Sequence, residues 1–274
     1  MPHRTPRFAA LVLATSVAAG AILCVALARH PPDELPGPHP VLFGVFATCL
    51  LVAELRPAYW LRYANTDVSL SWVFALSLLL IGATSGAIVV LAVAAAVGNH
   101  IARMDAIRNA FNTSQMILSL GAGAVVLHAL AAGDPAVTNT STIDERWLAA
   151  VLLAGIAIYA VNALLVAIAV STARGGSIAT HFVDGLRTNL SGDGLILALA
   201  PIAVQAGVRS RWLLFPLVLT GLGTYRVARL AGSREYEATH DELTGLLNLQ
   251  AFTRLVEAER DRAADQQDHA GRIA

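Results

Sequence analysis

The sequence predicts an all-α fold, a polytopic bundle of about eight transmembrane helices followed by a short cytoplasmic helical segment. Of the 274 residues, 56% are hydrophobic and 14% are charged, with a mean hydropathy of +0.61. Soluble domains carry about 25% charged residues, and disordered chains carry more. The apolar residues also lie in runs that suit membrane-spanning helices. These observations exclude an ordinary water-soluble enzyme and a disordered chain.

The first two predicted spans are Phe8–Ala28 and Val41–Ala53, separated by the proline-rich loop Arg29–Pro40. Ala26-Leu27-Ala28 resembles a secretory cleavage site, but the apolar stretch is longer than the roughly 7–15 residues of a signal peptide. We therefore predict an uncleaved first span, and cleavage would leave seven spans. The second run is short and can cross if its flanks snorkel or the bilayer thins.

The third run, Val68–Asn99, is too long for one ordinary span and barely long enough for two. Its centre, Gly82-Ala83-Thr84-Ser85-Gly86, supplies turn residues. We predict two short helices joined by a tight hairpin. A single span here would invert the orientation of everything that follows.

Four further spans complete the predicted bundle. Pro201 and Pro216 lie inside the last two, which membrane helices tolerate when neighbouring groups satisfy the freed carbonyl. Thr142-x-x-Glu145 has the spacing of a capping box before the sixth span. The four predicted spans are Met116–Ala132, Trp147–Val170, Gly194–Val208 and Trp212–Thr224.

Arginine placement favours the even number of spans. With the N-terminus inside, the inner loops hold Arg4, Arg7, Arg56, Arg62, Arg103, Arg108, Arg174 and Arg187, and the outer loops hold Arg29, Arg146, Arg209 and Arg211. This excess agrees with the positive-inside rule. We therefore predict a multi-pass protein of the bacterial inner (cytoplasmic) membrane with both termini in the cytoplasm.

Four polar residues are candidate site residues within the membrane half: Glu54, Asn112, Gln115 and Asn162. Such amides often form hydrogen bonds between helices, worth about 0.6 kcal/mol each. The alternative is a polar pocket that binds a ligand. Glu54 is either an interfacial acid near Arg56 or a buried acid that faces the start of the fifth span.

Other residues point to packing. Gly121-x-Gly123 predicts close contact between helices, and Cys24 and Cys49 are interpreted as small buried hydrophobes. His100 and His128 have no second histidine at helical spacing, so no metal site is predicted. The short outer loops imply that any stimulus is a small molecule bound within the helices or comes from the bilayer itself. No feature indicates nucleic-acid binding.

Composition changes sharply near Ala231–Gly232. Residues 1–231 carry a net charge of +4 and residues 232–274 carry −4. We predict three parts: a membrane domain at 1–224, a linker helix at 225–237 and a C-terminal segment at 238–274. The last contains Asp241, Leu243, Thr244, Gly245, Leu246 and Asn248, with a break at Gly245 and Asn248 before a helix from Gln250 onward.

These six residues match in register the opening D-x-L-T-G-L-x-N-R of the GGDEF domain, the catalytic domain of diguanylate cyclases, and the segment resembles that family. Leu249 stands where the family usually has arginine, so the ion pair of that arginine is in doubt. We expect the chain to end before the family's metal-binding aspartate, its nucleotide-contacting asparagine and the GG[DE]EF loop. No GG[DE]EF occurs in the sequence.

The resemblance implies a sensory or regulatory membrane region for a diguanylate cyclase, an enzyme of cyclic di-GMP signalling that acts as a homodimer. A complete α/β GGDEF domain would use Mg²⁺ and GTP, whereas this chain alone is expected to hold no cofactor. Whether the whole protein is an enzyme stays open. The alternatives are a small transporter or channel, which intramembrane amides and proline-broken helices would suit, and a passive membrane anchor.

Overall fold

The computed structural model describes residues 6–29, 33–55, 71–131, 145–216, 218–219, 238–239, 246, 248–253, 256 and 260, with the backbone alone for residues 187–196. Every regular element in these ranges is helical, which confirms the all-α prediction for the described part. The elements are α1 (Pro6–Arg29), α2 (Pro40–Leu55), α3 (Ser71–Leu80), α4 (Thr84–Ile101), α5 (Ala106–Leu130), α6 (Glu145–Arg174), α7 (Ile178–Arg209) and the 3-10 helix η3 (Arg211–Leu213).

Four of these helices, α1, α4, α5 and α6, are long and apolar enough to cross a membrane. Two others, α2 and α3, are apolar but shorter, as is the described part of α7 at Leu197–Arg209. The first and sixth predicted spans correspond to α1 and α6, which extend a few residues beyond the predicted boundaries at both ends.

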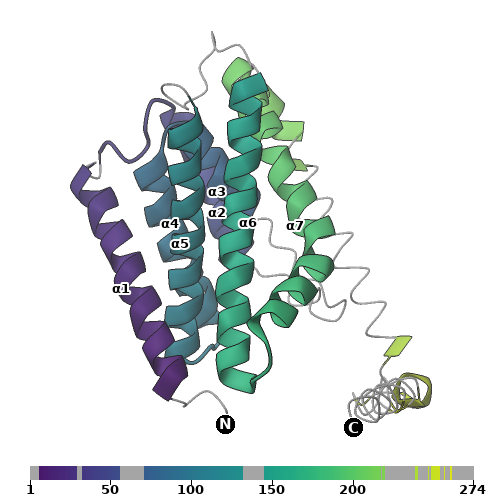
Figure 1. Ribbon diagram of the computed structural model, residues 1–274. Helices are drawn as coiled ribbons and strands as arrows, with labels where there is room; N and C mark the ends of the chain where they lie inside the picture. The colour runs from purple at the N-terminus through teal and green to yellow at the C-terminus, as the bar shows by residue number, and fades with distance from the viewer. Residues whose placement is uncertain are drawn as a thin grey trace. The chain divides into compact units, whose positions relative to one another are not determined.

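The helices pack around α5 and α3. Figure 1 shows α1, α4, α5 and α6 side by side, with α5 in contact with α1, α4 and α6. The short helix α3 packs against α2, α4 and α7, and nine of its ten residues are buried. Leu76, Leu78, Leu79 and Leu80 of α3 all belong to the main hydrophobic core.

The predicted hairpin within Val68–Asn99 is confirmed, but its turn is shorter than predicted. Only Ile81–Ala83 separate α3 from α4, and Gly82 has a φ of 79°, which glycine adopts readily. Gly86, predicted as a turn residue, lies in α4. It is buried, and an added Cβ there would meet the Leu35 carbonyl oxygen and, at 2.5 Å, the Phe43 ring. It is therefore a packing glycine.

The helix α7 is much longer than the predicted seventh span. It starts at Ile178, so Arg187, which was assigned to an inner loop before the span Gly194–Val208, lies within the helix. The corner between α6 and α7 contains Gly175 and Gly176, both at positive φ. His181 donates to the Gly175 carbonyl at 3.0 Å, so the corner is tied to the first turn of α7.

The chain divides into two compact units. One contains Met1–Pro57 and Thr66–Gly221, and the other contains Ala58–Asn65 and Leu222–Ala274. The first contains α1 to α7 and η3. Of the predicted eighth span, residues 212–216 and 218–219 are described and are helical. Thr142 and the predicted linker at 225–237 lie outside the described residues.

Candidate functional site

Glu54 lies where α2, α3 and α4 meet. Its side chain is half-buried and hydrogen-bonded to Ser71, which is fully buried at the start of α3. A Cβ on Gly98 of α4 would lie 2.5 Å from the Glu54 carbonyl oxygen. The described contacts of Glu54 are therefore with α3 and α4, whereas Arg56 lies outside the described residues.

The sequence analysis did not predict two further buried polar side chains, one in α3 and one in α4. Among the described residues, the Asn99 side-chain nitrogen and the Ser77 hydroxyl are buried and have no hydrogen-bond partner. Asn99 follows Gly98 directly and marked the end of the apolar run. Ser77 gave no signal, because serine in an apolar helix ordinarily bonds back to its own backbone.

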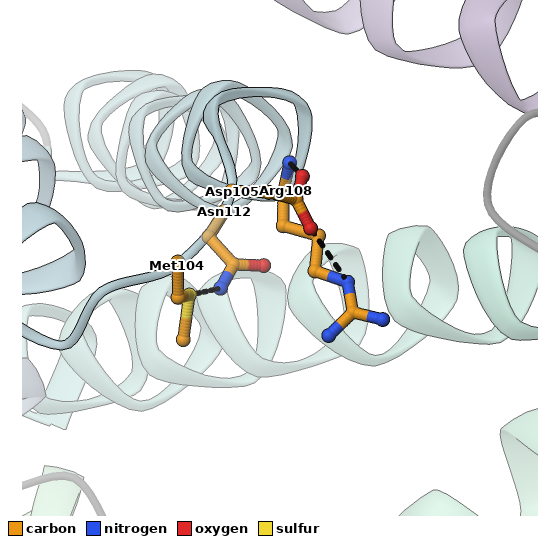
Figure 2. Close-up of polar contacts among 4 residues, drawn as sticks. All are labelled: Met104, Asp105, Arg108 and Asn112. Carbon is orange, nitrogen blue, oxygen red and sulfur yellow. Dashed lines mark hydrogen bonds and ion pairs between the residues drawn. The ribbon is translucent and has the colours of Figure 1, made fainter. Parts of the chain in front are cut away.

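Asn112 belongs to the corner between α4 and α5. Figure 2 shows Asn112 directed at Met104, with its amide nitrogen 3.3 Å from the Met104 sulfur. In the same corner, Asp105 caps α5 by accepting from the Arg108 backbone amide at 3.0 Å. The Arg108 Nε also lies 3.3 Å from the second Asp105 oxygen. Asn112 is therefore part of the turn that positions α5.

The polar start of α5 bonds to the neighbouring helices. Asn109 donates to the Ala96 carbonyl of α4 at 3.1 Å, and Ser114 donates to Ser16 of α1 at 3.1 Å. These bonds join α5 to its neighbours, the role that the sequence predicted for the amides of Asn112 and Gln115, but Asn109 and Ser114 make them instead. Gly121 and Gly123 also pack as predicted, with Gly123 against Ile158 of α6.

Gln115 and Asn162 differ from the other two predicted site residues in their hydrogen bonding. Each is half-buried and has a buried amide oxygen for which the described residues supply no partner. Gln115 follows Phe111 by one turn, and Phe111 clusters with Phe8 of α1 and Ala169 of α6. Asn162 follows Ile158 by one turn, and Ile158 packs against Gly123 of α5. An amide oxygen inside a bundle favours a hydrogen-bond donor, which a ligand or a water molecule can supply.

The structure thus places the four predicted residues in different surroundings. Glu54 contacts α3 and α4, and Asn112 closes the α4–α5 corner. Gln115 of α5 and Asn162 of α6 each have a buried amide oxygen for which the described residues supply no partner. A single pocket lined by all four stays a prediction.

We expect Ser77→Ala to leave the melting temperature unchanged or to raise it. The substitution removes a fully buried hydroxyl without a described partner, which costs about 1 kcal/mol or more to bury. Ser119→Ala is the matched control: Ser119 is equally buried in α5, but its hydroxyl donates to the Gln115 carbonyl at 2.7 Å. Thermal unfolding in detergent compares the two, and a clear loss for Ser77→Ala would contradict the prediction.

In the C-terminal segment, Asp241, Leu243, Thr244 and Gly245 lie outside the described residues, whereas Leu246 and Asn248 are described. The Asn248 side chain caps the helical residues 249–253, because the Ala251 amide donates to its oxygen at 2.9 Å. Its own amide nitrogen donates to the Ala238 carbonyl at 2.7 Å. The predicted break at Asn248 is confirmed, and the helix begins one residue before Gln250.

We expect Asn248→Ala to destabilise this cap by about 1 kcal/mol, the usual cost of losing a capping side chain. Asn248→Asp keeps the oxygen that accepts from Ala251 and loses the donor to Ala238. Hydrogen exchange at the Ala251 amide should therefore accelerate in Asn248→Ala and change little in Asn248→Asp. Equal acceleration in both variants would show that the cap is not what protects this amide.

The described fold is that of an all-helical protein with four helices able to cross a membrane. No group of three or more His, Cys, Asp or Glu side chains that could hold a metal ion occurs in the described ranges. Comparison with models of protein families, with curated proteins and with solved structures finds no match.

Proposed function

We propose that this chain is the membrane-embedded sensory or regulatory region of a diguanylate cyclase, with about eight spans and both termini in the cytoplasm. The observation that carries the proposal is the D-x-L-T-G-L-x-N pattern at residues 241–248, which follows the apolar helices. The capping role of Asn248 supports reading the pattern as a folded start of a domain, since it joins Ala238 to the following helix.

The arrangement of α2 and α4 supports the proposed topology. Gly86 at the start of α4 packs near Leu35 and Phe43, and Gly98 at its end packs on Glu54, the penultimate residue of α2. The two helices are therefore parallel. Parallel α2 and α4 with α3 between them in the chain are what a hairpin of two crossings would produce.

In the proposed function, the α5–α6 contact is the place where a stimulus acts. A small hydrogen-bond donor at Gln115 and Asn162, or a change in the bilayer, would alter the packing of α5 on α6. A stimulus can shift such an equilibrium only by binding the two arrangements with different affinity. The cytoplasmic GGDEF domains of a homodimer would then be brought together or apart. Mg²⁺ and GTP belong to that catalytic domain, where the metal assists attack on the α-phosphate.

Sequencing the gene beyond codon 274 tests the family assignment. The proposal predicts an in-frame strand with an aspartate and then a GG[DE]EF loop. A reading frame that continues into an unrelated domain, or that stops at this point, would overturn the assignment. Solute uptake by vesicles that contain the purified protein would favour the transporter alternative.

A further inference from the structure

A second, small hydrophobic cluster lies at one end of the bundle, apart from the main core. It consists of Phe8 of α1, Phe111 of α5 and Ala169 of α6. The two phenylalanine rings are 6.1 Å apart between centroids and tilted by 44°, an arrangement that aromatic pairs favour. Because α1 and α5 begin here and α6 ends here, the cluster fixes three helix ends side by side.

Each of these three helix ends carries an exposed arginine. Arg7 directly precedes Phe8, and Arg108 precedes Phe111 by three residues. Arg174 follows Ala169 by five residues. With a rise of 1.5 Å per residue, Arg108 and Arg174 lie about 4.5 and 7.5 Å beyond the cluster along their helices. All three arginines therefore border the same end of the α1–α5–α6 contact.

The ends of α1, α5 and α6 carry three arginines and one acid, Asp105. Asp105 is within ion-pair distance of Arg108, whereas Arg7 and Arg174 have no ion pair with a described acid. The side chains next to the cluster are apolar and partly exposed, among them Leu11 and Val12 of α1 and Leu165 of α6. Cationic groups above an apolar surface, at the end of spanning helices, match the depth and chemistry of a lipid headgroup and its acyl chains.

We propose that this end of the bundle binds an anionic phospholipid, with its phosphate at Arg7, Arg108 and Arg174 and its acyl chains along Leu11, Val12 and Leu165. The guanidinium group binds phosphate through two parallel hydrogen bonds, which favours arginine at such a site. Basic clusters between transmembrane helices bind acidic headgroups in this way. The bound lipid would hold the end of α1 against α5 and α6, which adds a membrane partner to the proposed function without depending on it.

Native mass spectrometry of the purified full chain tests the proposal. The protein is incubated with phosphatidylglycerol or with phosphatidylcholine of the same acyl chains, and retained lipid is counted for each variant. The test variant is Arg7→Gln with Arg174→Gln. The control is Arg29→Gln with Arg146→Gln, which removes the arginines at the opposite ends of the same two helices.

We expect the unmodified chain to retain phosphatidylglycerol over phosphatidylcholine. The test variant should lose about tenfold in this preference, because one charge-assisted hydrogen bond changes affinity by at least that factor. The control should keep the preference, and Arg7→Lys with Arg174→Lys should restore part of it, which separates charge from folding. Competition by soluble glycerol phosphate would show that the headgroup alone is recognised.

An equal loss in test and control variants, or no preference in the unmodified chain, would overturn the proposal. Thermal unfolding of each variant with phosphatidylglycerol present gives a second readout, since a ligand that binds only the folded state raises its stability. The lipid should raise the melting temperature of the control variant more than that of the test variant. The same increase in both would also contradict the site.

Discussion

Leu79→Ala is expected to lower the free energy of unfolding by about 2 kcal/mol, at the low end of the range for buried leucines. Leu79 is fully buried in α3, which packs against α2, α4 and α7. Lipid tails are as apolar as leucine, so the cost comes from lost packing rather than from exposure to water. The tight packing on three sides leaves little room for the cavity to collapse.

Two controls isolate this effect. Leu79→Met keeps the volume and is expected to cost less than about 1.5 kcal/mol. Leu13→Ala removes the same atoms from a side chain in α1 that is 67% exposed, so its stability should change little. Unfolding of the purified protein in mixed micelles measures all three. If Leu79→Ala and Leu13→Ala were equally stable, α3 would not be the packed centre of the bundle.

Gly98→Ala is expected to destabilise the protein by about 1–3 kcal/mol, the usual cost of adding atoms to a full contact. The new Cβ would lie 2.5 Å from the Glu54 carbonyl oxygen and 3.1 Å from its carbonyl carbon. Both neighbours are backbone atoms, so no side chain can rotate away. The end of α2 would have to move from α4 and would carry the Glu54–Ser71 hydrogen bond with it.

Gly44→Ala provides the matched control in α2. A Cβ there meets nothing within 4 Å, and alanine is favoured over glycine in helices by about 1 kcal/mol. Gly44→Ala should therefore be neutral or slightly more stable, while Gly98→Ala is less stable in the same unfolding assay. A loss of the same size in both variants would show that the α2–α4 contact does not depend on Gly98.

The lengths of the apolar runs in the sequence predicted the long apolar helices correctly. They located α1 and α6 to within a few residues, and the glycines in Val68–Asn99 revealed the hairpin. Run length did not predict the first half of α7, because this part of the helix contains His181 and other polar residues. Hydropathy measures transfer into lipid, whereas helix formation needs only a backbone that can form its own hydrogen bonds.

The candidate site was predicted residue by residue but not in its contacts. The polar start of the fifth span singled out Gln115, and depth within the sixth span singled out Asn162. That the amide oxygen of each is buried without a described partner follows only from the packing of the helices. The partner of Asn112 is the sulfur of Met104, which no sequence rule would select. The unpartnered hydroxyl of Ser77 could not be predicted from the sequence, because its lack of a hydrogen-bond partner arises only from the packing of α3.

Cellular cyclic di-GMP in a fusion protein tests the central proposal most directly. Residues 1–237 are joined to an active GGDEF domain that begins at its own D-x-L-T-G-L-x-N-R segment, with the same domain on unrelated spans as the control. A regulatory region predicts that Gln115→Ala with Asn162→Ala changes cyclic di-GMP by about fivefold or more, as coupled sites usually do. Equal cellular levels of cyclic di-GMP with the fusion, with its double variant and with the domain on unrelated spans would contradict the proposal. The membrane region would then be a passive anchor.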